Sequence, residues 1–268
     1  MTFRILFQVP FLKHMFQNSF SMTFSQFHLK IYSKWLWALG HKKQQTLPHE
    51  EFVIAVRLRL GASLIDSEAV CKLCGNAPID RCCHHPLTCA IGEATKGHTK
   101  IRDSVMDLAL KADPAAETEP VSLTSHPGLR PADILCSAAI RGSLAALDVG
   151  VTMPSDSVGD ADAAQLYLDA KIYKYRRYLD AMQAQGIVYK PMIWTAWGRA
   201  HPDVISVLRS LAIKAARRRG LISSQIILGE TRLSIALELQ ARAARMVMAC
   251  LPESYDDAGE AGPDAGCP

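Results

Sequence analysis

The chain has 268 residues, 49% of them hydrophobic, and a formal net charge of +4. This composition can supply a core for one large domain or two smaller ones, and the modest positive charge is compatible with nucleic acid without requiring it. No stretch reaches the roughly 18–20 uninterrupted apolar residues that a membrane-spanning helix needs, so we expect no membrane partner.

The two ends of the chain lack the pattern of a folded domain. Residues 1–47 show no clean period apart from an amphipathic helix near residues 27–40, so we expect a poorly defined segment there. It faintly resembles a targeting peptide but has no cleavage pattern. Residues 253–268 are rich in Gly, Ala and acids, which predicts a disordered acidic tail.

Residues 48–96 predict a helix followed by a small metal-binding module. The helix covers residues 48–60, with acids in its first turn and arginines near its end, as the helix dipole favours. Four donors follow at the spacing C-x2-C-x10-H-x3-C, which suits the tetrahedral set of a closed structural zinc site. The proposed ligands are Cys71, Cys74, His85 and Cys89.

Alternatives to this ligand set remain open. His84 is an alternative to His85, and Cys82 or Cys83 is an alternative thiolate. The close grouping of five of the eight cysteines favours metal over disulfides, and hence an intracellular reducing compartment. A site with no open coordination position would stabilise or bind, not catalyse.

Residues 97–252 predict an α/β domain. The expected elements are a helix over 97–112, strands over 117–124, 131–138 and 143–152, a helix over 160–185, a strand over 187–195, and helices over 202–219 and 222–250. The fold class is therefore α/β: a zinc-knuckle module, then a core of helix, three-stranded meander, helix and strand, with extra C-terminal helices.

Glu119, Asp133 and Asp148 each fall on a different one of the three meander strands. Adjacent strands lie about 4.8 Å apart, so carboxylates at matching heights can converge on one divalent cation such as magnesium. The alternative is that Asp133 and Asp148 cap strand ends or pair with Arg130 and Arg141. The spacing alone favours that alternative.

A series of short motifs in chain order favours the metal site over the structural alternative. They are Cys71–Cys89, GHTKIRD (97–103), EP (119–120), RPADIL (130–135), LDVGVT (147–152), KIYKY (171–175) and RLSIALELQARAARMV (232–247). The series resembles the C-terminal zinc knuckle and restriction-like endonuclease region of LINE-type non-LTR retrotransposon polyproteins, from about residue 50 to residue 252.

The resemblance implies a nuclear, metal-dependent endonuclease that nicks target DNA, with element RNA as a further partner. It implies structural zinc and catalytic magnesium or manganese. It also implies a reverse transcriptase region in a longer parent chain, since this sequence has no Y/F-x-D-D motif. The implied magnesium ligands are Asp133, Asp148 and Glu119, and the implied catalytic set adds Lys171, Lys174 and Tyr175.

The chain departs from the family pattern at three places. Gly97 precedes His98 where the family has an arginine, one residue separates Pro131 from Asp133, and Gly150 stands where a lysine is expected two residues after Asp148.

The lysine is therefore expected from the next helix, where Lys171, Lys174 and Tyr175 share one face. Lys171 is preferred; the alternative is a solvated helix face. These departures also leave room for a nucleic-acid-binding remnant that has lost cleavage, or for a purely structural zinc module.

Overall fold

The structure is a computed structural model that describes residues 46–65, 69–80, 83–121, 123–124, 126, 128–153 and 163–252. Helices in these residues are α3 (His49–Leu60), α4 (Pro86–Cys89), α5 (Ile91–Ala112), α6 (Ala163–Ala184), α7 (Pro202–Arg218) and α8 (Gln225–Cys250). Strands are β1 (Ala69–Val70), β2 (Pro78–Ile79), β3 (Glu117–Thr118), β4 (Ile134–Ile140), β5 (Ser143–Thr152) and β6 (Ile187–Thr195).

The main sheet has the strand order β3-β4-β5-β6. The first three strands form an antiparallel meander, and β6 runs parallel to β5. Parallel neighbours need a crossover, and α6 supplies it. The expected mixed α/β class is confirmed.

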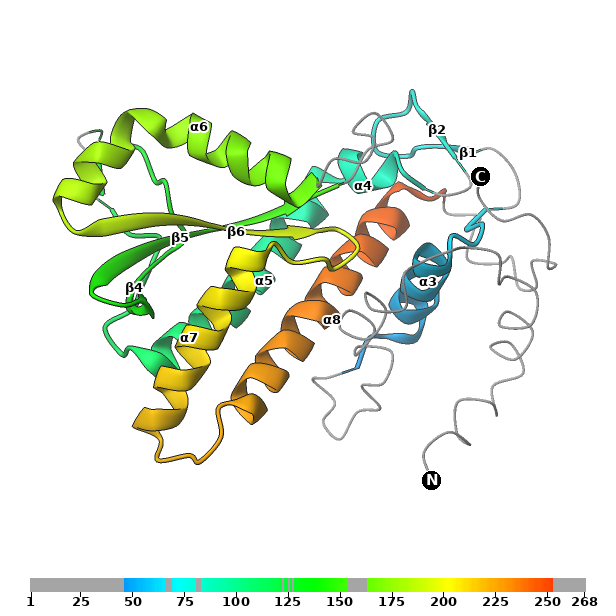
Figure 1. Cartoon of the computed structure of the whole chain (residues 1–268). Coiled ribbons are helices and arrows are strands. Elements are labelled where there is room, and N and C mark those ends of the chain that lie inside the picture. Colours follow the sequence, from blue (N-terminus) through cyan, green and yellow to red (C-terminus); the bar gives the residue numbers. More distant parts are fainter. Residues whose placement is uncertain are drawn as a thin grey trace.

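Strand β5 separates two cores, because successive side chains of a strand point to opposite faces. Ala145, Leu147 and Val149 pack into the larger core with α5, α7 and α8. Ala146 and Asp148 point to the other face, which α6 covers. Figure 1 shows α6 on one side of the sheet, and α5, α7 and α8 on the other.

The small β1–β2 sheet, α3 and α4 pack against the end of α8. Ile79 and Leu87 of this module are buried in one cluster with Met246 and Val247 of α8. The cysteine module therefore shares a hydrophobic core with the last helix of the main domain.

Several expected boundaries were wrong. Helix α5 begins at Ile91, six residues before the expected start. Strand β3 has only two residues, so Glu119 follows the strand and Asp133 lies just before β4. The expected helix near residues 27–40 and the acidic tail lie outside the described residues.

Within the described part of the chain, no helix has the length and apolarity to cross a membrane.

Candidate functional site

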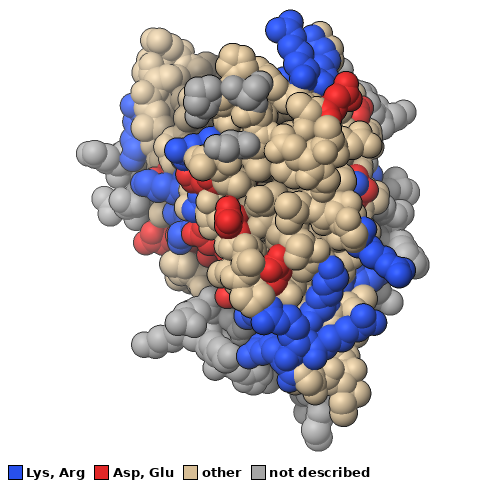
Figure 2. Space-filling view, turned by 90° about the vertical axis from the view of Figure 1, so that its left-hand side faces the viewer, with Lys and Arg blue, Asp and Glu red and all other residues tan. Residues whose placement is uncertain are grey.

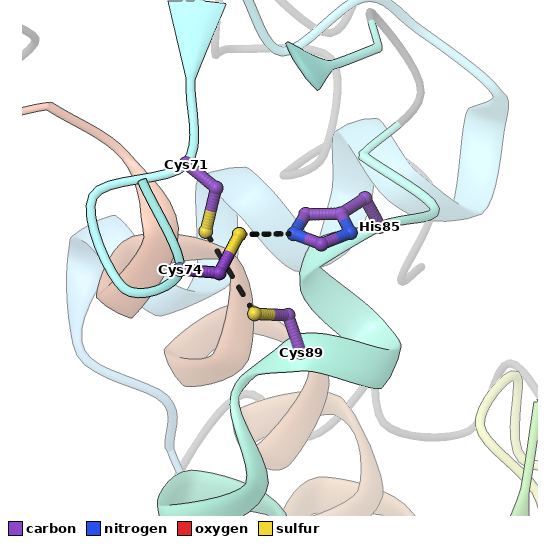
Figure 3. A group of neighbouring side chains, drawn as sticks. All are labelled: Cys71, Cys74, His85 and Cys89. Atoms are coloured by element: carbon purple, nitrogen blue, oxygen red, sulfur yellow. Dashed lines mark hydrogen bonds between the residues drawn. The ribbon is translucent and has the colours of Figure 1, made fainter. Parts of the chain in front are cut away.

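The four predicted zinc ligands come together in one cluster (Figure 3). Their ligand atoms all lie within 4.8 Å of one another; Cys71 Sγ is 3.9 Å from Cys89 Sγ, and Cys74 Sγ is 3.5 Å from His85 Nε2. A tetrahedral ion with Zn–S bonds of about 2.3 Å places its ligand atoms about 3.5–3.8 Å apart. The cluster therefore could bind zinc.

Local backbone geometry positions these four side chains. Cys71 and Cys74 flank a tight turn in which Gly75 has a φ of 69° and donates its N–H to the Cys71 carbonyl. His85 precedes α4, and Cys89 is the last residue of that one-turn helix. The C-x2-C and H-x3-C pairs thus face each other across the module.

The alternative ligands lie elsewhere. The backbone N–H of His84 donates to Asp80, and its ring lies 3.8 Å from the same carboxylate. Cys83 is fully buried in the apolar core, and burial, with the charge of Asp80, raises the pKa of its thiol to about 12. A neutral, buried thiol is a poor metal ligand, since thiolates bind metals. Cys82 lies outside the described residues.

The C-x2-C turn favours thiolates: the backbone N–H groups of Asn76 and Ala77 lower the pKa of Cys74, and the pKa of Cys71 is lowered too. Burial would raise the pKa of Cys71, but the backbone N–H groups of Cys74 and Leu73 outweigh it and leave the pKa at about 6.

Behind the cluster, the N–H of Lys72 donates to the carbonyl of Cys250 at the end of α8. The module is therefore tied to the main domain by backbone as well as by side chains.

The second group of predicted residues meets at the C-terminal half of β5. Lys171 of α6 donates to Asp148 Oδ1 at 2.8 Å, and the Tyr189 hydroxyl donates to Asp148 Oδ2 at 2.5 Å. Asp133 lies beside this pair and accepts the Val149 N–H at 2.7 Å through Oδ2. Both aspartates and Lys171 therefore occupy one site.

His98 of α5 completes this group. Its Nε2 lies 3.5 Å from Asp133 Oδ2 and 3.2 Å from the carbonyl oxygen of Val149. The hydrogen bond to Asp133 is the main cause that raises the pKa of His98.

The electrostatics of the site are those of a buried ion pair. Burial raises the pKa of Asp148, the Lys171 ammonium opposes this, and the nearby Asp133 carboxylate adds to it. Burial would lower the pKa of Lys171, but Asp148 outweighs it and the pKa is raised. A lysine with a raised pKa stays charged, so the site holds a fixed cation beside two carboxylates.

Packing around Gly150 explains why the lysine beside Asp148 comes from helix α6, as Lys171, and not from residue 150 of strand β5. A Cβ at Gly150 would lie 2.8 Å from both Ile193 Cδ1 and Tyr167 Cε1, well inside normal contact distance. The Tyr167 ring thus covers the position where a strand-borne lysine was expected. Lys171 follows one helical turn later, with its Nζ 5.7 Å from the centre of that ring.

The remaining predicted residues lie outside this group. Glu119 pairs with Arg102 at 2.7 Å and with Arg130 at 2.9 Å, so two arginines engage its carboxylate. Lys174 is exposed, with its Nζ 4.8 Å from the Tyr175 ring centre.

Tyr175 is buried and packs edge-on against Tyr189, 5.4 Å between ring centres. It supports Tyr189, which holds Asp148. Among the described residues, only the Cys71–Cys89 quartet groups three or more metal-binding side chains closely.

A cleft of about 290 Å³ opens at this site between α5, β5, α6 and α8. Its lining includes His98, Gly150, Tyr167, Lys171 and Arg242. His98 and Arg242 were noted only as parts of motifs, and Tyr167 and Tyr189 were not predicted from the sequence. No local signal marks them, because each reaches the site from a different element.

A basic surface lies at the end of α7, where Arg217, Arg218 and Arg219 are exposed. Figure 2 shows Lys and Arg side chains gathered on the lower part of the face that includes this helix end. Part of this surface is engaged within the protein, since Arg218 donates to the Ala112 carbonyl. The three arginines are nevertheless exposed to solvent, as expected for a run of basic residues at a helix end.

In comparisons with known proteins, no protein-family model and no curated protein matches the chain. Conclusions about function therefore depend on the site itself.

Proposed function

We propose that the chain is a metal-dependent endonuclease that hydrolyses DNA phosphodiester bonds, with a structural zinc in the Cys71–Cys89 module. The observation that carries the proposal is that Lys171 and His98 line one cleft, and that Lys171 pairs with Asp148 and His98 with Asp133 directly behind it. Two carboxylates with an adjacent fixed cation are the groups that metal-assisted phosphodiester hydrolysis uses.

The donor set fits a hard divalent cation. Asp133 and Asp148 offer carboxylate oxygens, which magnesium and manganese prefer, and the cleft beside their partners His98 and Lys171 leaves room for water and phosphate. Such an ion would polarise a phosphoryl oxygen and lower the pKa of bound water. Glu119 is engaged by two arginines, so the proposed ion has two carboxylate ligands.

The other side chains hold these groups in place. The Val149 N–H fixes the Asp133 carboxylate, and the Tyr189 hydroxyl fixes one oxygen of Asp148. Lys171 keeps its positive charge at the cleft, where it can stabilise negative charge developing on phosphoryl oxygens. His98 holds Asp133 from the α5 side.

The two lysines on α6 provide a matched test. We expect Lys171→Met to lower the rate of plasmid nicking by about 10²–10³-fold, as for loss of one preorganised charge-stabilising group. DNA affinity should change little. Lys174→Met removes an equal charge one turn away on the exposed side and should leave nicking almost unchanged. Equal effects of both substitutions would contradict a catalytic role for Lys171.

A second candidate function is nucleic-acid binding without cleavage. The observation that favours it is that Asp148 already has a partner on each oxygen, Lys171 and Tyr189. A zinc-loaded protein that binds DNA but never nicks it in magnesium or manganese would support this candidate. Under either candidate, we propose from the resemblance that the chain derives from a retrotransposon polyprotein.

A further inference from the structure

Arg242 is the one strongly basic group of the cleft that has no carboxylate partner among the described residues. It lies on α8, is only 8% exposed, and lines the cleft together with His98 and Lys171. Its Nε donates a hydrogen bond to the carbonyl of Ala94, at 3.3 Å. By contrast, Lys171 is paired with Asp148, and His98 with Asp133.

The chain makes specific room for this arginine. A Cβ at Gly97 would lie 2.4 Å from Arg242 Cγ and 2.6 Å from its Cβ. Only glycine at residue 97 lets the aliphatic part of Arg242 cross α5 at this point. The residue is thus held by packing on the α5 helix, one turn from the Ala94 carbonyl.

A buried cation without a counter-charge is unfavourable unless something else compensates it. Burial lowers the pKa of Arg242, but an arginine stays protonated in proteins. The planar guanidinium also presents donors that match the oxygens of a phosphate group. The missing counter-charge is therefore expected from an anion that enters the cleft.

We propose that Arg242 is the phosphate-binding residue of the cleft, and that it positions a backbone phosphate of a nucleic acid beside Asp133, Asp148 and Lys171. This inference rests on the proposed endonuclease function for the identity of the ligand, but it makes a prediction of its own. Phosphate binding through Arg242 needs neither a divalent cation nor turnover.

The test is titration of the whole zinc-loaded chain with inorganic phosphate, by calorimetry, without added magnesium. We expect saturable binding that Arg242→Met weakens by about tenfold or more, since hydrogen bonds to charged groups are lost. Methionine keeps an aliphatic stem over Gly97, and Arg242→Lys should retain part of the affinity. Arg141→Met removes an exposed arginine at the β4–β5 turn and should bind phosphate as the parent does.

The outcomes separate the two proposals. Phosphate affinity that is the same in Arg242→Met and in the parent overturns the inference, as does the absence of saturable binding to the parent. A parent that binds phosphate through Arg242 but nicks no DNA in magnesium contradicts the endonuclease function alone. If the parent nicks DNA, Arg242→Met should raise the DNA concentration needed for half-maximal rate, and an unchanged value counts against the inference.

Discussion

The space around Gly150 allows the stability of a Gly150→Ala variant to be predicted from interatomic distances. A Cβ added at this residue would approach Ile193 Cδ1 and Tyr167 Cε1 to 2.8 Å, against about 3.5–4.0 Å for an ordinary carbon contact. Ile193 is fully buried in β6, so it has little room to move. We expect Gly150→Ala to destabilise the protein, because overpacking a filled core costs about 1–3 kcal/mol.

The unfolded state offsets part of this cost. Alanine in place of glycine reduces the entropy of the unfolded chain, which is worth about 0.4–1 kcal/mol in favour of folding. The net loss in free energy of unfolding is then between about 0 and about 2.6 kcal/mol, with a middle value of about 1.3 kcal/mol. For a domain of this size, each kcal/mol corresponds to a fall of about 2–4 °C in melting temperature.

Urea unfolding of the zinc-loaded chain measures this loss directly. Gly229→Ala is a matched control: residue 229 lies inside α8 with nothing within 4 Å of a new Cβ, so that change should stabilise. Ile193→Val removes Cδ1 and should partly rescue Gly150→Ala, giving a coupling energy of about 0.5 kcal/mol or more. A Gly150→Ala variant that is more stable than the parent and shows no coupling to Ile193→Val would refute the close packing around Gly150.

Three further predictions concern the zinc module and the end of α5. Cys74→Ser should lose the one bound zinc, whereas His84→Ala should keep it, both measured by metal analysis; zinc retained in Cys74→Ser would contradict the ligand set. Removing zinc with a chelator should expose the β1–β2 module to protease while the main sheet stays folded, and no change in cleavage would speak against a structural ion. Burial would raise the pKa of Asp113, but the N–H and hydroxyl of Ser137 outweigh it and lower the pKa. The ionised Asp113 therefore stabilises the fold at neutral pH, and this stabilisation is lost as the pH falls below 3.8, the usual pKa of an aspartate. The melting temperatures of the parent and of Asp113→Asn should therefore converge in acid. A difference in melting temperature that stays constant with pH would contradict this.

The sequence was most informative where the signal is local. The Cys/His cluster was predictable because two short spacings each place a pair of side chains on one turn. Strand β5 has the expected bounds, since a turn at residues 141–142 and an apolar run define it. Lys171 was preferred over Lys174 because the resemblance pointed to this helix and Tyr175, one turn later, could pack beneath Lys171.

The rest depended on contacts between distant segments. Glu119 was expected on a strand, but it follows β3 with a φ of 49° and pairs with Arg102 from α5. Arg242 reaches the cleft from α8 and fills the space at Gly97, which neither segment reveals by itself. Packing of this kind is set by the tertiary fold and leaves no periodic pattern in the sequence.

The central claim is tested most directly by nicking of supercoiled plasmid with the zinc-loaded chain. We expect nicking in magnesium or manganese, none when these ions are omitted, and none for Asp148→Asn. Asp107→Asn, an exposed acid on α5, should nick like the parent. Nicking by Asp148→Asn at the parent's rate, or a folded parent that never nicks with either ion, would contradict the proposed active site.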